Sequence, residues 1–256
     1  MRFSTQTFLT ATLLLIFSSS ICVGDTLKLC VSDSNWHPYV IIEGNEVSGI
    51  YIDMLTSAVE LLSHEIEFEI LPWKRCLHQT KEGKYDGIAG VSYQEKRAVY
   101  LDYPNDTNHS THSEFRLSQV EYVVVTMQED AHKFSGDVKT LPVPIRSPLG
   151  FSIGIELEKQ GLLVDNAALN DSANIRKLRQ DKTGSVVLIK EMALLLINNN
   201  SDLTIHKQPL KSKAYFLAFS KKTKLTQHQK AQLWNAGKNI RKNKVFMHKT
   251  LAKYHQ

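Results

Sequence analysis

The chain has 256 residues and a formal net charge of +5, and this length allows one large domain or two small ones. Hydrophobic residues make up 42% of it and charged residues 22%, which are ordinary values for a soluble globular protein. Basic residues cluster at 221–224 and 238–244 without interleaved aromatic residues. We interpret them as solvated helix surface and expect no nucleic-acid partner, because a nucleic-acid footprint would be denser.

The first 24 residues have the pattern of a signal peptide. Arg2 gives a positive start, residues 8–17 give a short apolar core, and Gly24 is a small residue suited to cleavage. No later segment reaches the roughly 18 uncharged apolar residues of a membrane span. We therefore expect a soluble periplasmic protein. A lipid anchor at Cys22 is the alternative, although the residues before it are a poor lipidation context.

Cleavage would leave two cysteines, Cys30 and Cys76. Two thiols in an oxidising compartment allow a disulfide, and two alone cannot make a structural zinc site. A pair of buried free thiols is the alternative, because the sequence does not set the distance between their Cα atoms.

The first part of the chain alternates between predicted strands and helices. A polar, aromatic loop with Trp36 and Tyr39 follows the first strand. The order argues for a parallel sheet that holds a ligand at the C-terminal ends of its strands. Strands are predicted at 27–31, 66–70 and 88–91, helices at 54–62 and 75–81, and a hairpin turn at 43–46.

Residues 83–97 form the stretch around which the rest of the chain is organised. Two glycines supply backbone freedom before a short buried strand, and Ser92 precedes Glu95 by the spacing of a capping box at a helix start. The free N–H groups of such a helix, with the fork of Arg97, would form an anion site. A strand–turn–helix corner with a solvated arginine is the alternative.

The second part of the chain again alternates between strands and helices. It therefore predicts a second α/β lobe of similar class, with the two lobes joined near residues 117–121 and 211–213. Strands are predicted at 121–125, 141–145, 185–189, 203–206 and 215–219, and helices at 155–161, 174–180, 192–197 and 225–240.

Residues 150–154 match the G-x-S-x-G nucleophile elbow of hydrolases, with Ser152 at its centre. Prolines interrupt the straight strand that the elbow needs, so the start of a helix is the other interpretation. The chain order would still permit a triad that uses Asp165, Asp171 or Asp181 and then His206.

A second candidate for other chemistry is a polar loop after residue 104. His109, His112 and Glu114 are metal ligands by type. Three such groups in a flexible loop without supporting partners are not expected to hold a metal, so we expect no metal site.

Four motifs in order along the chain resemble the bacterial extracellular solute-binding proteins of family 3, the polar amino-acid binding group of ABC importers. They are a glycine–apolar–aspartate helix start, a Trp-containing segment, a G-K-x-D turn and a Ser-x-x-x-x-Arg pattern, at Gly49–Met54, Leu71–Arg75, Gly83–Gly87 and Ser92–Arg97. The resemblance spans nearly all of the mature chain and is strongest from Leu27 to Tyr103.

The resemblance implies a fold and its division into lobes. The fold is α/β, a two-lobed periplasmic-binding-protein fold of type II, in which each lobe is a mostly parallel sheet flanked by helices and two strands form the hinge. We expect residues 25–118 and 213–256 in lobe 1 and residues 119–212 in lobe 2.

The resemblance also implies a carboxylate site in the cleft. Arg97 would pair with the carboxylate through both arms of its guanidinium, which suits a dehydrated carboxylate as lysine would not. A hydroxyl, the backbone of 150–152 and aromatic walls would complete the site. The expected ligand-binding residues are Arg97, Ser92, Asp33, Trp36, Tyr39, Trp73, Ser152 and Glu191.

The second lobe departs from the family pattern. Residues 182–185 replace the usual Gly-Arg-x-Asp, and Lys190 and Glu191 stand where amine-binding members have an acid. Glu191 in the cleft would hold an α-ammonium, whereas Lys190 there would favour an anionic ligand without an amine.

The predicted protein is a monomeric, non-enzymatic periplasmic binding protein without cofactor or metal. It would capture an amino acid or a related small carboxylate by lobe closure for ABC import, with a membrane permease or sensor as partner. The alternatives are an orphan sensory or interaction module of the same fold, and a dehydratase-type enzyme that uses Glu191 or Asp33 as its acid.

Overall fold

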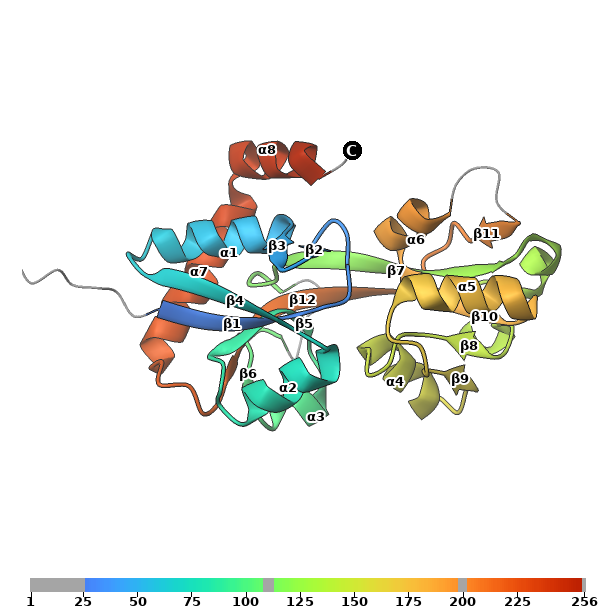
Figure 1. Ribbon diagram of the computed structural model, residues 1–256, viewed down its shortest axis with the longest axis horizontal. Helices are drawn as coiled ribbons and strands as arrows, with labels where there is room; N and C mark the ends of the chain where they lie inside the picture. Colours follow the sequence, from blue (N-terminus) through green and yellow to red (C-terminus); the bar gives the residue numbers. More distant parts are fainter. Residues whose placement is uncertain (1–25, 108–112, 198–201, 255–256) are drawn as a thin grey trace, which may run out of the picture.

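The computed structural model describes residues 26–107, 113–197 and 202–254. Two halves lie side by side, and a single mixed sheet runs through both of them (Figure 1). The predicted signal peptide, Cys22, His109 and His112 lie outside the described residues. None of the helices in the described ranges is long and apolar enough to cross a bilayer.

The strands of the main sheet follow the order β4-β1-β5-β12-β7-β10-β8-β9. Within the first half β1 pairs in parallel with β4 and β5, and within the second β8 pairs in parallel with β9 and β10. These strands are β4 (Glu65–Leu71), β1 (Thr26–Ser32), β5 (Gly87–Ser92), β12 (Lys211–Ser220), β7 (Ser118–Met127), β10 (Ser185–Ile189), β8 (Ile145–Arg146) and β9 (Val164–Asp165).

Four short strands complete the sheets. β11 pairs with β7 and β6 pairs with β12, while β2 and β3 form a separate hairpin. The hairpin confirms the predicted turn at 43–46. The bounds are β6 (Leu101–Asp102), β11 (Leu203–Ile205), β2 (Ile41–Glu43) and β3 (Glu46–Ser48).

Two long antiparallel strands, β7 and β12, join the halves. The first residues of β12, 211–215, pair with β7, and residues 215–219 pair with β5. Tyr215 therefore lies at the change of partner, opposite Ser118 of β7 and Ser92 of β5. The α/β, two-lobed fold with a largely parallel sheet in each half is thereby confirmed.

Helices cover both faces of the sheet, and the C-terminal helices return to the first half (Figure 1). α7 packs against α1 and α8. The helices are α1 (Ile50–Glu60), α2 (Trp73–Lys81), α3 (Glu95–Ala98), α4 (Ser152–Lys159), α5 (Asp171–Asp181), α6 (Lys190–Leu196), α7 (Gln227–Lys242) and α8 (Lys244–Tyr254), with 3-10 turns η1 (Gln128–Lys133) and η2 (Val138–Thr140).

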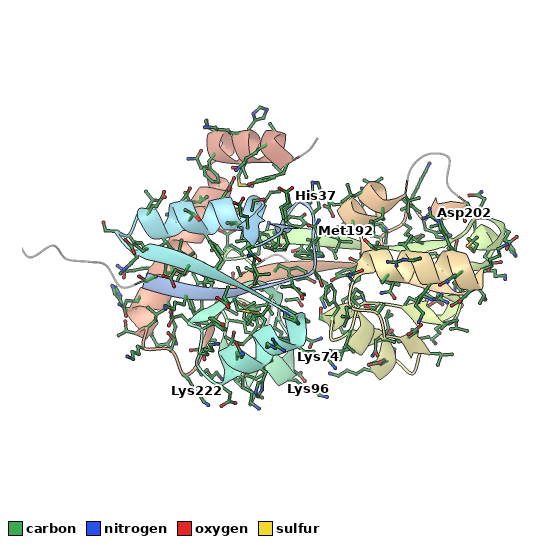
Figure 2. All side chains as sticks on the ribbon, viewed as in Figure 1. His37, Lys74, Lys96, Met192, Asp202 and Lys222 are labelled. Carbon is green, nitrogen blue, oxygen red and sulfur yellow. A yellow bond between two sulfur atoms is a disulfide. The ribbon has the colours of Figure 1, made fainter. Side chains whose placement is uncertain are left out.

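The burial of each strand follows from its sequence. All five residues of β10, S-V-V-L-I, are buried, as expected of a strand covered on both faces. In β4 the glutamates are exposed and the apolar residues between them are half-buried, which suits an edge strand with one wet face. Figure 2 shows how side chains fill both halves, with Lys74 near their junction and Asp202 at the far end of the second half.

Several predicted boundaries were wrong. The capping box does not form: Ser92 ends β5, and α3 begins after Gln94 without a side-chain cap. The helix expected at 155–161 begins at Ser152, and the strand expected at 141–145 shrinks to Ile145–Arg146, because two prolines remove ladder donors from the approach. The separate helix α8 was not predicted.

Cys30 of β1 and Cys76 of α2 form a disulfide, with their Cα atoms 5.7 Å apart. Both residues are fully buried. The bond ties α2, whose first residue is Trp73, to the centre of the first half's sheet.

Removal of the disulfide is expected to lower the free energy of unfolding. The bridge closes a loop of sequence separation 46, for which the chain-entropy model gives about 4 kcal/mol. Urea unfolding of the Cys30→Ala/Cys76→Ala double variant, compared with the unaltered protein, measures the loss. Equal unfolding free energies would contradict the prediction, and added reductant should not change the double variant.

The carboxyl of Asp171 is expected to make stability depend on pH. It is 5% exposed and its Oδ1 has no hydrogen-bond partner in the described chain, and burial raises its pKa to about 7. Between about pH 4 and 7 the folded chain holds a proton that the unfolded chain releases, so the unfolding free energy falls as pH rises.

Asp171→Asn removes this titration. At pH 8 the variant should be more stable than the unaltered protein by on the order of 4 kcal/mol, and at pH 4 the two should be alike. Urea unfolding of both proteins at the two pH values makes the comparison. The same pH slope in both proteins would show that the carboxyl is not the cause.

Candidate functional site

A pocket opens between the two halves, where β1 and β5 end. Parallel strands place their C-terminal ends at one edge of a sheet, so this is the expected position of a ligand site. Both halves and the strand β12 contribute to its lining: Ser32, Ser34, Trp36, Val40, Trp73, Ala89, Gly90, Ser92, Arg97, Phe151, Ser152 and Tyr215.

Gly90 shapes the floor of this pocket. Its φ is +82°, a left-handed conformation that suits glycine. A Cβ atom at this position would lie 2.6 Å from the ring of Tyr51. The backbone of β5 can therefore approach the aromatic residues behind the pocket only because residue 90 has no side chain.

Arg97 of α3 is the charged group of the pocket, and it is only 4% exposed. Its Nη1 donates to the carbonyl and the hydroxyl of Ser92 at 3.1 and 3.2 Å, and its Nη2 donates to the carbonyl of Gly150 at 3.2 Å. Its guanidinium carbon lies 5.3 Å from the ring centre of Trp73. Each acceptor is uncharged, and no carboxylate of the described residues forms an ion pair with Arg97.

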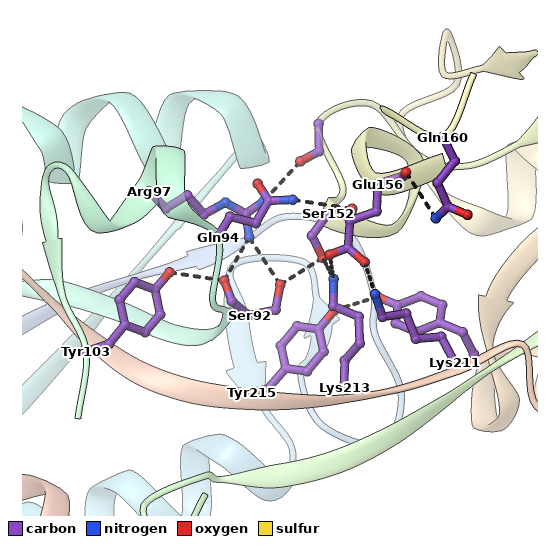
Figure 3. A network of polar contacts seen from close by, with 12 residues as sticks. Ser92, Gln94, Arg97, Tyr103, Ser152, Glu156, Gln160, Lys211, Lys213 and Tyr215 are labelled. Carbon is purple, nitrogen blue, oxygen red and sulfur yellow. Dashed lines mark hydrogen bonds and ion pairs between the residues drawn. The ribbon is translucent and has the colours of Figure 1, made fainter. Parts of the chain in front are cut away.

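The start of α4 reaches across to the first half (Figure 3). The hydroxyl of Ser92 donates to that of Ser152 at 2.8 Å, and the amide of Gln94 donates to the carbonyl of Ser152 at 3.3 Å. The indole of Trp73 donates to the carbonyl of Gly150 at 3.2 Å. Residues 150–152 therefore contact the first half through backbone and hydroxyl groups.

Lys213 of β12 brings a second cation next to the pocket (Figure 3). It is 8% exposed, and its Nζ donates to the hydroxyl of Ser152 at 2.6 Å and to the carboxylate of Glu156. Burial lowers the pKa of Lys213 to about 8. Burial opposes ionisation of Glu156, but Lys213 and Lys211 hold its pKa below the usual value.

Aromatic side chains form one wall of the site. The ring centres of Trp36 and Tyr215 are 4.5 Å apart, and those of Trp36 and Tyr39 are 5.2 Å apart. The hydroxyl of Tyr39 donates to Oε1 of Glu191 at 3.1 Å. Burial first, and then the neighbouring carboxylate of Glu191, raise the pKa of Tyr39 well above its usual range, so Tyr39 stays a neutral donor.

Five of the expected ligand-binding residues come together on the pocket lining, and three do not. Tyr39 and Glu191 lie outside the lining and bond to each other. Asp33 is exposed, at the bend that follows β1, while its neighbours Ser32 and Ser34 line the pocket. The five on the lining are Arg97, Ser92, Trp36, Trp73 and Ser152.

Lys190 and Glu191, the two residues left open at the position where amine-binding family members have an acid, also contact different partners. Lys190 is exposed, and its Nζ lies 3.6 Å from a carboxylate oxygen of Glu121. It therefore does not reach the pocket. Sequence reasoning missed Lys213 and Glu156 altogether; a lysine in K-S-K before an apolar strand has the pattern of a solvated residue, and only the pairing of β12 brings it inward.

The nucleophile elbow does not assemble a hydrolase triad. Ser152 is the first residue of α4, and its hydroxyl contacts Ser92 and Lys213, while His206 bonds to Thr126 at 3.1 Å. Asp165 pairs with Lys177 and Asp181 with Arg146, so these acids have other partners.

The metal candidates do not form a cluster in the part of the chain that the structure describes. Within it, no three His, Cys, Asp or Glu side chains are grouped to hold an ion. Glu114 forms an ion pair with Lys242 of α7, which draws it to the first half's helical face.

A comparison with protein-family models matches the part of the chain that forms the first half. Residues 28–116 match the family model described as Bacterial extracellular solute-binding proteins, family 3. No curated protein sequence matches the chain. The matched segment contains β1 to β6, and with them Arg97, Ser92 and the first-half wall of the pocket.

Solved structures with the same fold include proteins of three kinds. A P235GK mutant of ArgBP from T. maritima superposes with a TM-score of 0.71 at 17% identity, over 90% of this chain and 95% of that one. A histidine kinase sensor domain with similarity to periplasmic binding proteins gives the same TM-score, identity and coverage. The ancestral amino acid-binding protein AncCDT-1, a precursor of cyclohexadienyl dehydratase, gives 0.66 at 15% identity, over 90% and 96%.

The family-model match and the superposed structures agree on the kind of protein that this chain resembles. The first half carries the sequence pattern of the family, and the described chain carries the two-lobed fold of periplasmic binding proteins. The resemblance drawn from the four motifs is thereby confirmed over residues 28–116, which carry the pattern of family 3 solute-binding proteins.

Proposed function

We propose that this protein captures a small solute bearing a carboxylate, an amino acid or a relative of one, in the pocket between its halves. The single observation that carries the proposal is the buried guanidinium of Arg97, which has no acidic partner among the described residues. Binding serves uptake through an ABC importer, with a membrane permease as the partner and the periplasm as the place.

The electrostatics of Arg97 support an anionic ligand. A buried charge loses its hydration, and neutral acceptors return only part of that free energy. A carboxylate supplies the missing counter-charge and accepts two parallel N–H groups from one guanidinium. The hydroxyls of Ser92 and Ser152 lie beside it and provide further hydrogen bonds.

The connection between the halves supports closure as the mechanism. We assign residues 25–118 and 213–256 to one lobe and 119–212 to the other, so that β7 and β12 pass between them as the hinge. Residues 150–152 of the second lobe bond to Trp73, Gln94 and Arg97 of the first. Small changes in the two strands would make or break these contacts together, as in hinge closure around a ligand.

A sensory role is the second candidate, because a histidine kinase sensor domain superposes as well as an arginine-binding protein does. In that role the same closure would report the ligand to a membrane partner. An enzymatic role has less support, since the lining of the pocket contains no Asp, Glu or His among the described residues. Proton transfer by such a side chain is a common need of dehydration chemistry.

Ligand-dependent thermal unfolding tests the carboxylate site. A ligand at ~100 times its Kd should stabilise the protein by about 2.7 kcal/mol, which raises the Tm of a chain of this size by roughly 5–11 °C. The panel contains amino acids, their 2-oxo acids and dicarboxylates. Arg97→Lys keeps the charge but loses the fork, so it should lose most of the shift.

Arg97→Met should lose the shift completely, because neither charge nor donors remain. Cooperative unfolding of both variants without ligand shows that they fold. A panel without any shift, or an equal shift in Arg97→Met, would refute the carboxylate site.

A further inference from the structure

We infer that the ligand is a carboxylate without an α-ammonium group, such as a 2-oxo acid, and not an amino acid. The inference rests on the proposed carboxylate site at Arg97 and names the class of ligand that this site takes. It is carried by the charged groups around the pocket, because the described lining holds a guanidinium and no carboxylate.

An α-ammonium in a pocket shielded from water needs a carboxylate, because a buried unpaired charge is costly. No acidic residue of the described chain lines this pocket. Its polar lining consists of one guanidinium and five hydroxyls, from Arg97, Ser32, Ser34, Ser92, Ser152 and Tyr215.

Glu156 is the acid nearest to Ser152, and its charge is already neutralised. Both Lys211 and Lys213 form ion pairs with it, one through each carboxylate oxygen. Together with Arg97, the two lysines make three cations around the single carboxylate of Glu156. An incoming ammonium would meet Lys213 behind Ser152 and would be repelled, whereas an anion would be attracted.

Glu191 is the other acid that an amine would need. It lies outside the pocket lining, and its Oε1 accepts the hydroxyl of Tyr39. Tyr39 in turn stacks against Trp36, whose ring forms the pocket wall. Oε2 of Glu191 is buried and has no partner in the described chain, so this oxygen is the one place where an ammonium could still be held.

The hydroxyl of Ser152 also favours an anion. It accepts hydrogen bonds from Ser92 and from Lys213. A hydroxyl has two lone pairs and one proton, so with both lone pairs engaged it meets a ligand as a donor. An ammonium has no acceptor to offer it, but a carboxylate or a 2-oxo group has.

Matched ligand pairs test the inference, since each pair differs in the amine alone. Calorimetric titration of the protein compares phenylalanine with phenylpyruvate, leucine with 4-methyl-2-oxopentanoate, and glutamate with 2-oxoglutarate. In the pair whose side chain fits the pocket, we expect the oxo acid to bind at least about tenfold more tightly than the amino acid. A tenfold difference corresponds to the free energy of one charge-assisted hydrogen bond.

Lys213→Met should weaken the binding of that oxo acid by about tenfold or more for the same reason, and Lys213→Arg should retain most of it. Thermal unfolding of each variant without ligand shows whether it is folded.

Two results would overturn the inference and leave the carboxylate site standing. One is an amino acid that binds as tightly as its oxo acid or more tightly. The other is an amino-acid preference that disappears in Glu191→Gln, which would place the ammonium on Oε2. Binding of neither member of any pair would overturn the carboxylate site and the inference together.

Discussion

The antiparallel pairing of β7 with β12 is the constraint on which the rest of the structure depends. β12 changes partner at Tyr215, from β7 of one half to β5 of the other. This change places Tyr215 beside Ser92 and carries Lys213, two residues earlier, to the start of α4. The pocket and the junction of the halves are thus built from the same few residues.

The charge on Arg97 sets the direction of the hydrogen bonds around the pocket. Guanidinium donates to Ser92, Ser92 donates to Ser152, and Lys213 donates to Ser152 from the other side. In a medium of low dielectric, consecutive hydrogen bonds of this kind polarise one another in the same direction. The chain is complementary to an oxygen anion, and reversing it for a cation would require the loss of Arg97 or Lys213.

Sequence reasoning reached the fold and about half of the site. The buried run of β10 and the alternation in β4 have clear periods, so their place in the sheet could be predicted. Lys213 could not be placed: nothing local distinguishes it from a solvated lysine, and its burial follows from contacts with Glu156, far away in the sequence. Glu191 lies outside the pocket lining, and its position depends on Tyr39 of the other half.

The place of β12 in the sheet has a consequence for the order in which the chain matures. β5 is flanked on one side by β1 and on the other by β12, and α1 is covered by α7. All of the second half is translated between β5 and β12. Until β12 emerges, the nascent first half has an open strand edge and an uncovered apolar helix, which are features of aggregation-prone intermediates. The half that begins first is therefore completed last, and its open strand edge persists while the second half is made.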